Sequence, residues 1–234
     1  MKKTYVAVVM AVIVAFSSAI GLCLRVLTAP RFVSAFDREL CIVLDAGHGG
    51  IDGGVVGRNT GIKESDLNLS ITYKLKDCLE NRGFHVELTR KTEAGLYGTT
   101  AKGFKKRDMQ KRKEIIEEAD PALLISIHQN FYPTRNTRGG QVFYGKEQAG
   151  SRRLAVALQE KINRLYAVEG ARGRNAASGQ FFILQCADCP SVIVECGFLS
   201  NEEDERLLSL ESWQTDLAKI VADGVMDYFT EATA

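Results

Sequence analysis

Three residues that can do chemistry stand at the ends of short apolar runs in this chain. They are His48, His128 and Glu195, and the runs before them cover residues 42–44, 123–127 and 192–194. Such runs predict buried strands, and the strands of an open α/β sheet hold ligands at their carboxyl ends. The chain has only three histidines, so the recurrence of this context in two of them is informative. We expect the three side chains to converge at one rim of a sheet.

A fourth residue, Glu64, lies just before a predicted helix that would pack back on the first of these strands. Catalytic zinc sites commonly use two histidines and one carboxylate, and they leave a fourth position open for water. His48, Glu64 and His128 therefore form a candidate metal site. Glu195, at the end of another apolar run, adds a second carboxylate to this constellation.

Each of these residues also has an ordinary structural role open to it. The histidines can be hydrogen-bonding residues of loops, and Glu64 can belong to the cap of the helix that follows it. Glu195 can pair with an arginine or cap the helix after Asn201. We favour the chemical interpretation because all four residues occur together, each in its own matching context.

In combination, these motifs resemble the zinc-dependent N-acetylmuramoyl-L-alanine amidases. The resemblance rests on Gly47-His48-Gly49-Gly50 with Asp52 and Gly54, on Glu64, on Ser126-Ile127-His128 with Asn130, and on Glu195-Cys196-Gly197-Phe198 with Ser200-Asn201. It runs from about residue 41 to residue 229. The compact layout and the segments 103–107 and 142–146 also resemble the sporulation- and germination-specific CwlD type.

The resemblance implies a zinc ion held by His48, Glu64 and His128, with Glu195 as the catalytic general base. It implies a peptidoglycan substrate, cleaved at the amide between N-acetylmuramic acid and L-alanine. The role would be spore cortex maturation, in which muramic acid is prepared for lactam formation, or cell-wall remodelling. An activating protein is a possible partner, because some relatives require one.

Two other functions stay open at this point. A zinc peptidase that cuts within the peptidoglycan stem peptide would use the same ligands on a different amide. A non-catalytic wall-binding domain would need a ligand or Glu195 to be missing, and none is missing. Thirty basic and twenty-nine acidic residues give a net charge of +1, which argues against nucleic acid as a partner.

The N-terminus has the pattern of an export segment. Lys2 and Lys3 precede an uncharged apolar run over residues 5–24, which fits a signal peptide or a membrane anchor. We expect an anchor or signal at 1–25, a tether at 26–40 and a zinc amidase catalytic domain at 41–232. The protein would be exported, either anchored in the membrane and facing the cell wall or secreted after signal cleavage. Membrane contact is expected only through this segment.

Alternating strands and helices predict a single α/β domain, a largely parallel twisted sheet with helices on both faces. The predicted strands cover residues 41–44, 84–89, 122–127, 141–144, 181–184 and 192–194. The predicted helices end near residues 82, 119, 166, 208 and 229. Ser65 or Asp66 is the expected cap of the first helix.

Four features outside the candidate site carry further expectations. His85 alternates away from its apolar neighbours and is expected at the surface. The glycine-containing segments 91–104 and 169–180 are candidate walls of a substrate groove. Arg112 is expected on a solvated helix face, with an inward position towards an anionic group as the alternative. Cys186 and Cys189 form a C-x-x-C without a second pair to complete a four-thiolate site.

Overall fold

A computed structural model describes residues 40–231 of the chain. The expected signal or anchor at 1–25 and the tether up to residue 39 lie outside the described residues. Within the described range, the helices are too short or too polar for any of them to cross a membrane.

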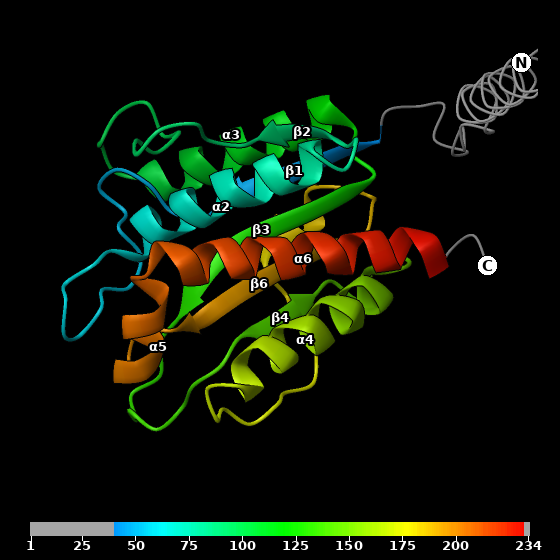
Figure 1. The fold of residues 1–234 in the computed structure, drawn as a ribbon. Helices are drawn as coiled ribbons and strands as arrows, with labels where there is room; N and C mark the ends of the chain where they lie inside the picture. Colours follow the sequence, from blue (N-terminus) through cyan, green and yellow to red (C-terminus); the bar gives the residue numbers. More distant parts are fainter. Residues whose placement is uncertain (1–39, 232–234) are drawn as a thin grey trace, which may run out of the picture. The chain divides into compact units, whose positions relative to one another are not determined.

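The centre of the domain is a six-stranded mixed sheet with the strand order β2-β1-β3-β6-β4-β5 (Figure 1). The strands are β1 (Cys41–Ala46), β2 (His85–Leu88), β3 (Leu123–Asn130), β4 (Gln141–Tyr144), β5 (Ala177–Ser178) and β6 (Ser191–Phe198). β2, β1, β3 and β6 run parallel to one another, whereas β4 pairs antiparallel with β6. The expected single α/β domain is therefore confirmed, and its largely parallel sheet contains one antiparallel junction.

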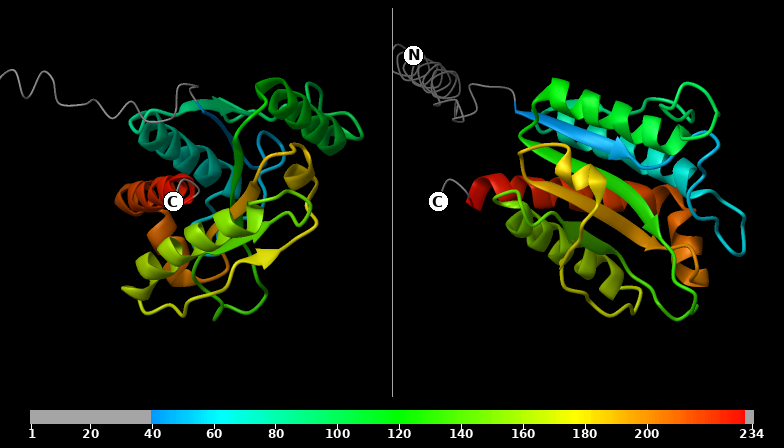
Figure 2. Two further views of the ribbon diagram at one scale, coloured as in Figure 1. Left: turned by 90° about the vertical axis from the view of Figure 1, so that its right-hand side faces the viewer. Right: turned by 180° about the vertical axis from the view of Figure 1, so that it is seen from behind.

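Helices cover both faces of the sheet, as expected. One face carries α2 (Glu64–Glu80), α4 (Ser151–Ala167) and α6 (Glu211–Glu231), and the other carries α3 (Phe104–Ala119) and the 3₁₀ helix η1 (Phe182–Gln185) (Figure 2). A short helix, α5 (Glu202–Leu208), follows β6.

The apolar runs of the central strands are explained by this double cover. In β1, Ile42 and Leu44 pack into the larger core beneath α2, while Val43 packs into the smaller core with Ile116 of α3. A strand that is buried on both faces needs apolar side chains at successive positions. The near-continuous runs therefore belong to the middle of the sheet.

Three local predictions were wrong or incomplete. Residues 181–184 do not form a strand, because Phe181 and Phe182 are exposed and Ile183 and Leu184 begin the buried part of a 3₁₀ turn. The two-residue strand β5 was missed, since it carries no apolar pattern. The first helix begins at Glu64 without a side-chain cap from Ser65 or Asp66, and its flanking residue is Lys63.

Candidate metal centre

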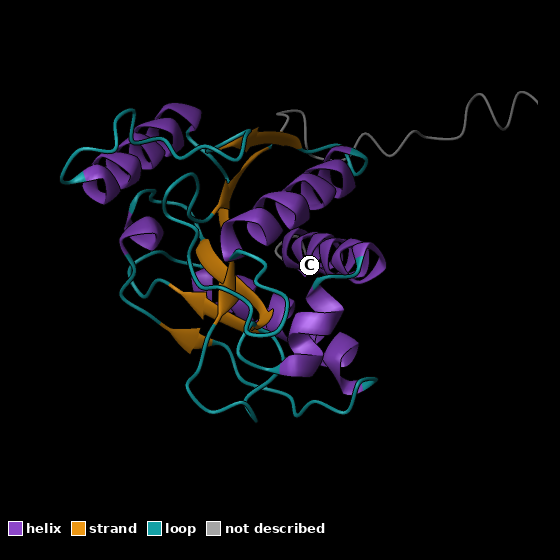
Figure 3. Cartoon of the chain, turned by 90° about the vertical axis from the view of Figure 1, so that its left-hand side faces the viewer, coloured by secondary structure: helices purple, strands orange, loops and turns teal. Residues whose placement is uncertain are grey.

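The candidate site lies at the carboxyl ends of the parallel strands, where loops gather over the edge of the sheet (Figure 3). The chain leaves β1 through a turn in which His48 itself has the left-handed backbone angle φ of 61°. Gly47, just before it, leaves room for a neighbour: a β-carbon there would lie 2.2 Å from Nε2 of His128. The glycines around His48 thus allow two histidines from different strands to approach each other.

The structure brings the three predicted metal ligands together. Oε1 of Glu64 lies 3.3 Å from Nε2 of His48 and 2.8 Å from Nδ1 of His128. One ligand atom from each residue lies within 4.8 Å of the other two. Two imidazoles and one carboxylate in this proximity are the donor set of catalytic zinc sites, so these residues fit a divalent metal ion.

Neighbouring groups fix the orientation and the charge of these ligands. Oδ2 of Asp52 lies 3.2 Å from Nδ1 of His48, which leaves Nε2 for the centre of the site. Burial alone would raise the pKa of Glu64, but the hydrogen bonds with His128 and His48 outweigh it and hold that pKa well below the usual range. The backbone N–H of Val55 donates to Oε2 of Glu64 at 2.9 Å, so that Oε1 is the oxygen turned to both histidines.

Glu195 lies beside this cluster, in register with His128 on the neighbouring strand. Burial raises its pKa from 4.5 to about 7, although His128 acts in the opposite direction. Its Oε2 atom is buried and has no hydrogen-bond partner among the described residues. Neither ordinary role considered for Glu195 is observed within residues 40–231: it forms no arginine pair, and the cap of α5 is Asn201.

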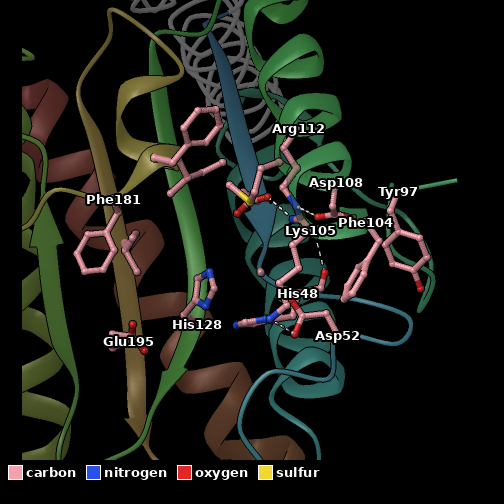
Figure 4. Close-up of a pocket in the computed structure, with 16 residues that line it drawn as sticks. His48, Asp52, Tyr97, Phe104, Lys105, Asp108, Arg112, His128, Phe181 and Glu195 are labelled. Carbon is pink, nitrogen blue, oxygen red and sulfur yellow. Dashed lines mark hydrogen bonds and ion pairs between the residues drawn. The ribbon is translucent and has the colours of Figure 1, made fainter. Parts of the chain in front are cut away.

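His48, His128 and Glu195 line a cavity of about 340 Å³. Tyr97 and Phe104 lie on one side of it and Phe181 on the other (Figure 4). His48 and His128 lie between these sides, and Glu195 lies on the side of Phe181. The segment 91–104 therefore contributes to a wall of the cavity, as expected. None of residues 169–180 is among the residues that line it, so this predicted wall is not observed. Residues 170–174 and 178–180 border two other surface depressions.

A buried charge network supports the turn that carries His48. The side chain of Arg112 is turned inward, and its guanidinium lies 2.5 Å from Asp45 and 2.7 Å from Asp108. Burial by itself raises the pKa of Asp45, but Arg112, Ser126 and Thr89 together lower it to about 2. The solvated helix face that the sequence favoured is therefore wrong for Arg112, and its alternative, an inward position, is observed. The sequence gave no signal for the pairing with Asp45.

Arg90 is a second buried guanidinium that sequence reasoning missed. It is 1% exposed, and its pKa is lowered to about 10 by burial and by Arg112, so it is still charged at neutral pH. The remaining histidine, His85, is exposed and lies near Glu87, outside the site, as expected.

Three candidate metal ligands beside a half-buried carboxylate, at the rim of an α/β sheet, are the arrangement of a metal-dependent hydrolase. The chain belongs to the N-acetylmuramoyl-L-alanine amidase family Amidase_3, whose family model matches residues 42–227. The expected family is thereby confirmed.

Individual relatives point to the same family. The chain is 32% identical over 193 residues to the germination-specific N-acetylmuramoyl-L-alanine amidase of Bacillus subtilis, an alignment that covers 81% of this chain and 80% of the relative. It is 28% identical to the amidase AmiA of Escherichia coli, over 80% of this chain and 75% of the relative. Among solved structures, the CwlD amidase from Clostridioides difficile in complex with the GerS lipoprotein superposes with a TM-score of 0.77 and 35% identity, covering 82% of this chain and 98% of that one.

Proposed function

We propose that this protein hydrolyses the amide between N-acetylmuramic acid and L-alanine in peptidoglycan. Its metal ion would be zinc, held by His48, Glu64 and His128, and its general base would be Glu195. The observation that carries this proposal is the buried Oε2 of Glu195, which has no hydrogen-bond partner within residues 40–231 and belongs to the same cavity lining as His48 and His128, two of the three converging ligands.

The residues divide the chemistry between them. His48, Glu64 and His128 would hold the zinc ion, which would supply a water of lowered pKa, about 7, and a Lewis acid for the scissile carbonyl. Glu195 takes a proton from the attacking water at its carboxylate and later delivers this proton to the leaving amine, so the charge is balanced over the cycle. A pKa of about 7 suits both tasks near neutral pH. Asp52 holds the His48 ring in the orientation that turns Nε2 to the metal.

The cellular role that we propose is spore cortex maturation, in which removal of the stem peptide prepares muramic acid for lactam formation by another enzyme. The similarity to a germination-specific amidase and to a CwlD amidase supports this role over general wall remodelling. An activating protein partner is also proposed, because the CwlD structure is that of a complex with a lipoprotein. Export through the segment 1–25, with or without its cleavage, completes the proposal.

The products of purified peptidoglycan, analysed by mass, test the bond that is cleaved. The proposed amidase releases stem peptides with a free L-alanine N-terminus and leaves the lactyl group on the glycan, and a chelator stops the reaction. Fragments cut within the stem would instead favour the zinc peptidase. Peptidoglycan that stays uncleaved in the presence of wild-type protein and zinc would favour a wall-binding domain.

Variants of single residues test the roles within the site. We expect Glu195→Ala to lower the hydrolysis rate by about 10²–10⁴-fold while bound zinc stays near one per chain. We expect His128→Ala to lose zinc as well as activity. His85→Ala is the matched control, since this histidine lies outside the site, and it should keep both. Wild-type turnover by Glu195→Ala would remove Glu195 from the mechanism.

A further inference from the structure

We propose that Arg90 and Arg112 are positioning residues that fix the backbone of the turn carrying His48 and thereby set the affinity of the site for its metal ion. This inference rests on the metal centre proposed above, but it concerns side chains that do not touch the metal. It assigns a function to two buried cations that the catalytic chemistry does not use.

The turn needs support from outside the sheet. His48 has a φ of 61°, a left-handed backbone conformation. Residues other than glycine keep this conformation only when their surroundings hold it. The carbonyl oxygens of three successive residues, Ala46, Gly47 and His48, all accept hydrogen bonds from the two arginines. The backbone on which the His48 ring is mounted is therefore held at three consecutive points.

Arg90 connects this turn to the helix that carries Glu64. Its Nε donates to the carbonyl of Ala46 at 2.8 Å, and its Nη2 donates to those of Gly47 at 3.0 Å and Ser65 at 2.7 Å. Ser65 directly follows Glu64 in α2. One guanidinium thus fixes the relative position of two metal ligands that are sixteen residues apart in the sequence, at positions 48 and 64.

The surroundings of Arg90 are unusual for a buried cation. Among the described residues it forms no ion pair, and its hydrogen-bond acceptors are all backbone carbonyls. Burying a charge without a carboxylate partner is unfavourable, so stability alone does not account for this arrangement. The arrangement does hold the site in place.

Arg112 approaches the same turn from α3. Its Nη1 donates to the carbonyl of Ala46 at 2.8 Å and its Nη2 donates to that of His48 at 2.6 Å. Asp45 and Asp108 hold the guanidinium in place, and Figure 4 shows Arg112 and Asp108 beside each other on the α3 side of the cavity. The contact with His48 is made to its backbone, not to its ring.

Lysine is the informative replacement for either arginine. It preserves the charge, but a single ammonium group cannot reproduce the planar fork that reaches several carbonyls at once. If the arginines position His48, the lysine variants will hold the ligands less well and will bind the metal more weakly. If the arginines only stabilise the fold, the variants will melt earlier but bind the metal as before.

The test measures the zinc dissociation constant of the zinc-free full chain by competition with a chromophoric chelator. For Arg90→Lys and Arg112→Lys we expect affinity to fall by about 10–100-fold, the effect typical of groups that orient metal ligands. Arg153→Lys is the matched control. Arg153 of α4 also donates to a backbone carbonyl, that of Tyr228 in α6, at 2.6 Å, but it is not part of the site. Its zinc affinity should stay within about twofold of wild type.

The outcomes separate this inference from the proposed function. Unchanged zinc affinity in the lysine variants, with or without a lower melting temperature, overturns the positioning role. If Arg112→Lys does not fold because Asp45 loses its partner, Arg90→Lys decides alone, since Arg90 leaves no carboxylate unpaired. A wild-type protein that binds no zinc overturns the metal centre and this inference together. Wild-type protein that binds zinc but leaves peptidoglycan intact overturns the amidase proposal alone.

Discussion

At the scale of single residues, the site depends on two carboxylates with opposite environments. Glu64 is surrounded by two histidines and by backbone donors, which favour its ionised form. Glu195 has a buried Oε2 atom with no hydrogen-bond partner within residues 40–231, and desolvation favours its protonated form and raises its pKa to about 7. Two carboxylates whose pKa values are pushed apart mark the ligand and the acid–base group of a hydrolase.

The raised pKa of Glu195 predicts a pH-dependent stability of the zinc-free protein. Between pH 4.5 and about 7 the folded state holds a proton on Glu195 that the unfolded state has released, so this group lowers the free energy of unfolding as pH rises. Glu195→Gln removes that contribution. From pH 4 to pH 8, we expect the free energy of unfolding of the variant to rise by about 1–3 kcal/mol relative to that of wild type.

Urea unfolding of the zinc-free forms at these two pH values measures the effect. The comparison uses the change with pH in each protein, so a constant effect of the substitution on packing cancels. Equal changes in the two proteins would show that Glu195 ionises in the folded state as it does in solution.

At the scale of elements, the turn after β1 has to bring His48 close to His128 of β3. The sequence provides this proximity with Gly47, at which a β-carbon would lie 2.2 Å from the His128 ring. Since this ring belongs to one of the three proposed metal ligands, a side chain at position 47 would displace a group of the site.

Gly47→Ala is therefore expected to weaken zinc binding by about tenfold or more, because it moves a ligand of the metal. Gly53→Ala is the control in the same loop, since its β-carbon would lie 3.4 Å from the flexible chain of Lys63 and should be accommodated. Zinc affinity and hydrolysis rate are measured for both. Wild-type affinity in Gly47→Ala would mean that the turn opens without cost.

The aromatic wall at Tyr97 is held by a side chain of the following helix. Arg107 of α3 donates to the carbonyls of Tyr97, Thr99, Lys102 and Ala101. Asp108 accepts from the backbone N–H of Leu96. Side chains at the start of α3 thus hold the backbone of this segment.

Arg107→Ala should loosen this wall without affecting the metal. Loss of these exposed hydrogen bonds is expected to lower the free energy of local opening by about 1–2 kcal/mol. The measurement is amide hydrogen exchange, which should become faster over residues 95–103. The KM for peptidoglycan fragments should rise while zinc affinity is unchanged. Arg164→Ala, an exposed arginine on α4, is the control. Unchanged exchange in the Arg107 variant would contradict the role of this side chain.

At the scale of the whole domain, the metal would join three segments that are distant in sequence. His48 follows β1, Glu64 begins α2 and His128 lies in β3. A ligand that binds only the folded state stabilises it, by about 2.7 kcal/mol when free zinc is about 100 times the dissociation constant.

Removal of zinc by a chelator is therefore expected to lower the melting temperature by about 5–10 °C for a domain of this size. The same treatment of His128→Ala should have little effect, because that variant has already lost a ligand. A melting temperature of wild type that does not respond to chelator would argue against a bound metal that spans these elements.

The sequence by itself determined the family, the central strands and the identity of the site residues that the structure brings together. Local sequence patterns predict these features, namely the apolar runs, the residue at the end of each run and the helical spacing of apolar residues in α2. It did not determine η1 or β5, because a short apolar run and a polar pair carry no reliable local signal.

Only the tertiary structure decided how the site is supported. The register of β3 with β6 places Glu195 beside His128, and burial then raises its pKa. Packing of α3 turns Arg112 inward, and Arg90 reaches the same turn from the end of β2. Burial and hydrogen bonding between segments far apart in the sequence depend on where the whole chain passes. The contacts of Asp45 with Thr89 and Ser126 illustrate this at separations of 44 and 81 residues. A local sequence pattern identifies which side chain can act, whereas the fold around that side chain determines its ionisation state and its position.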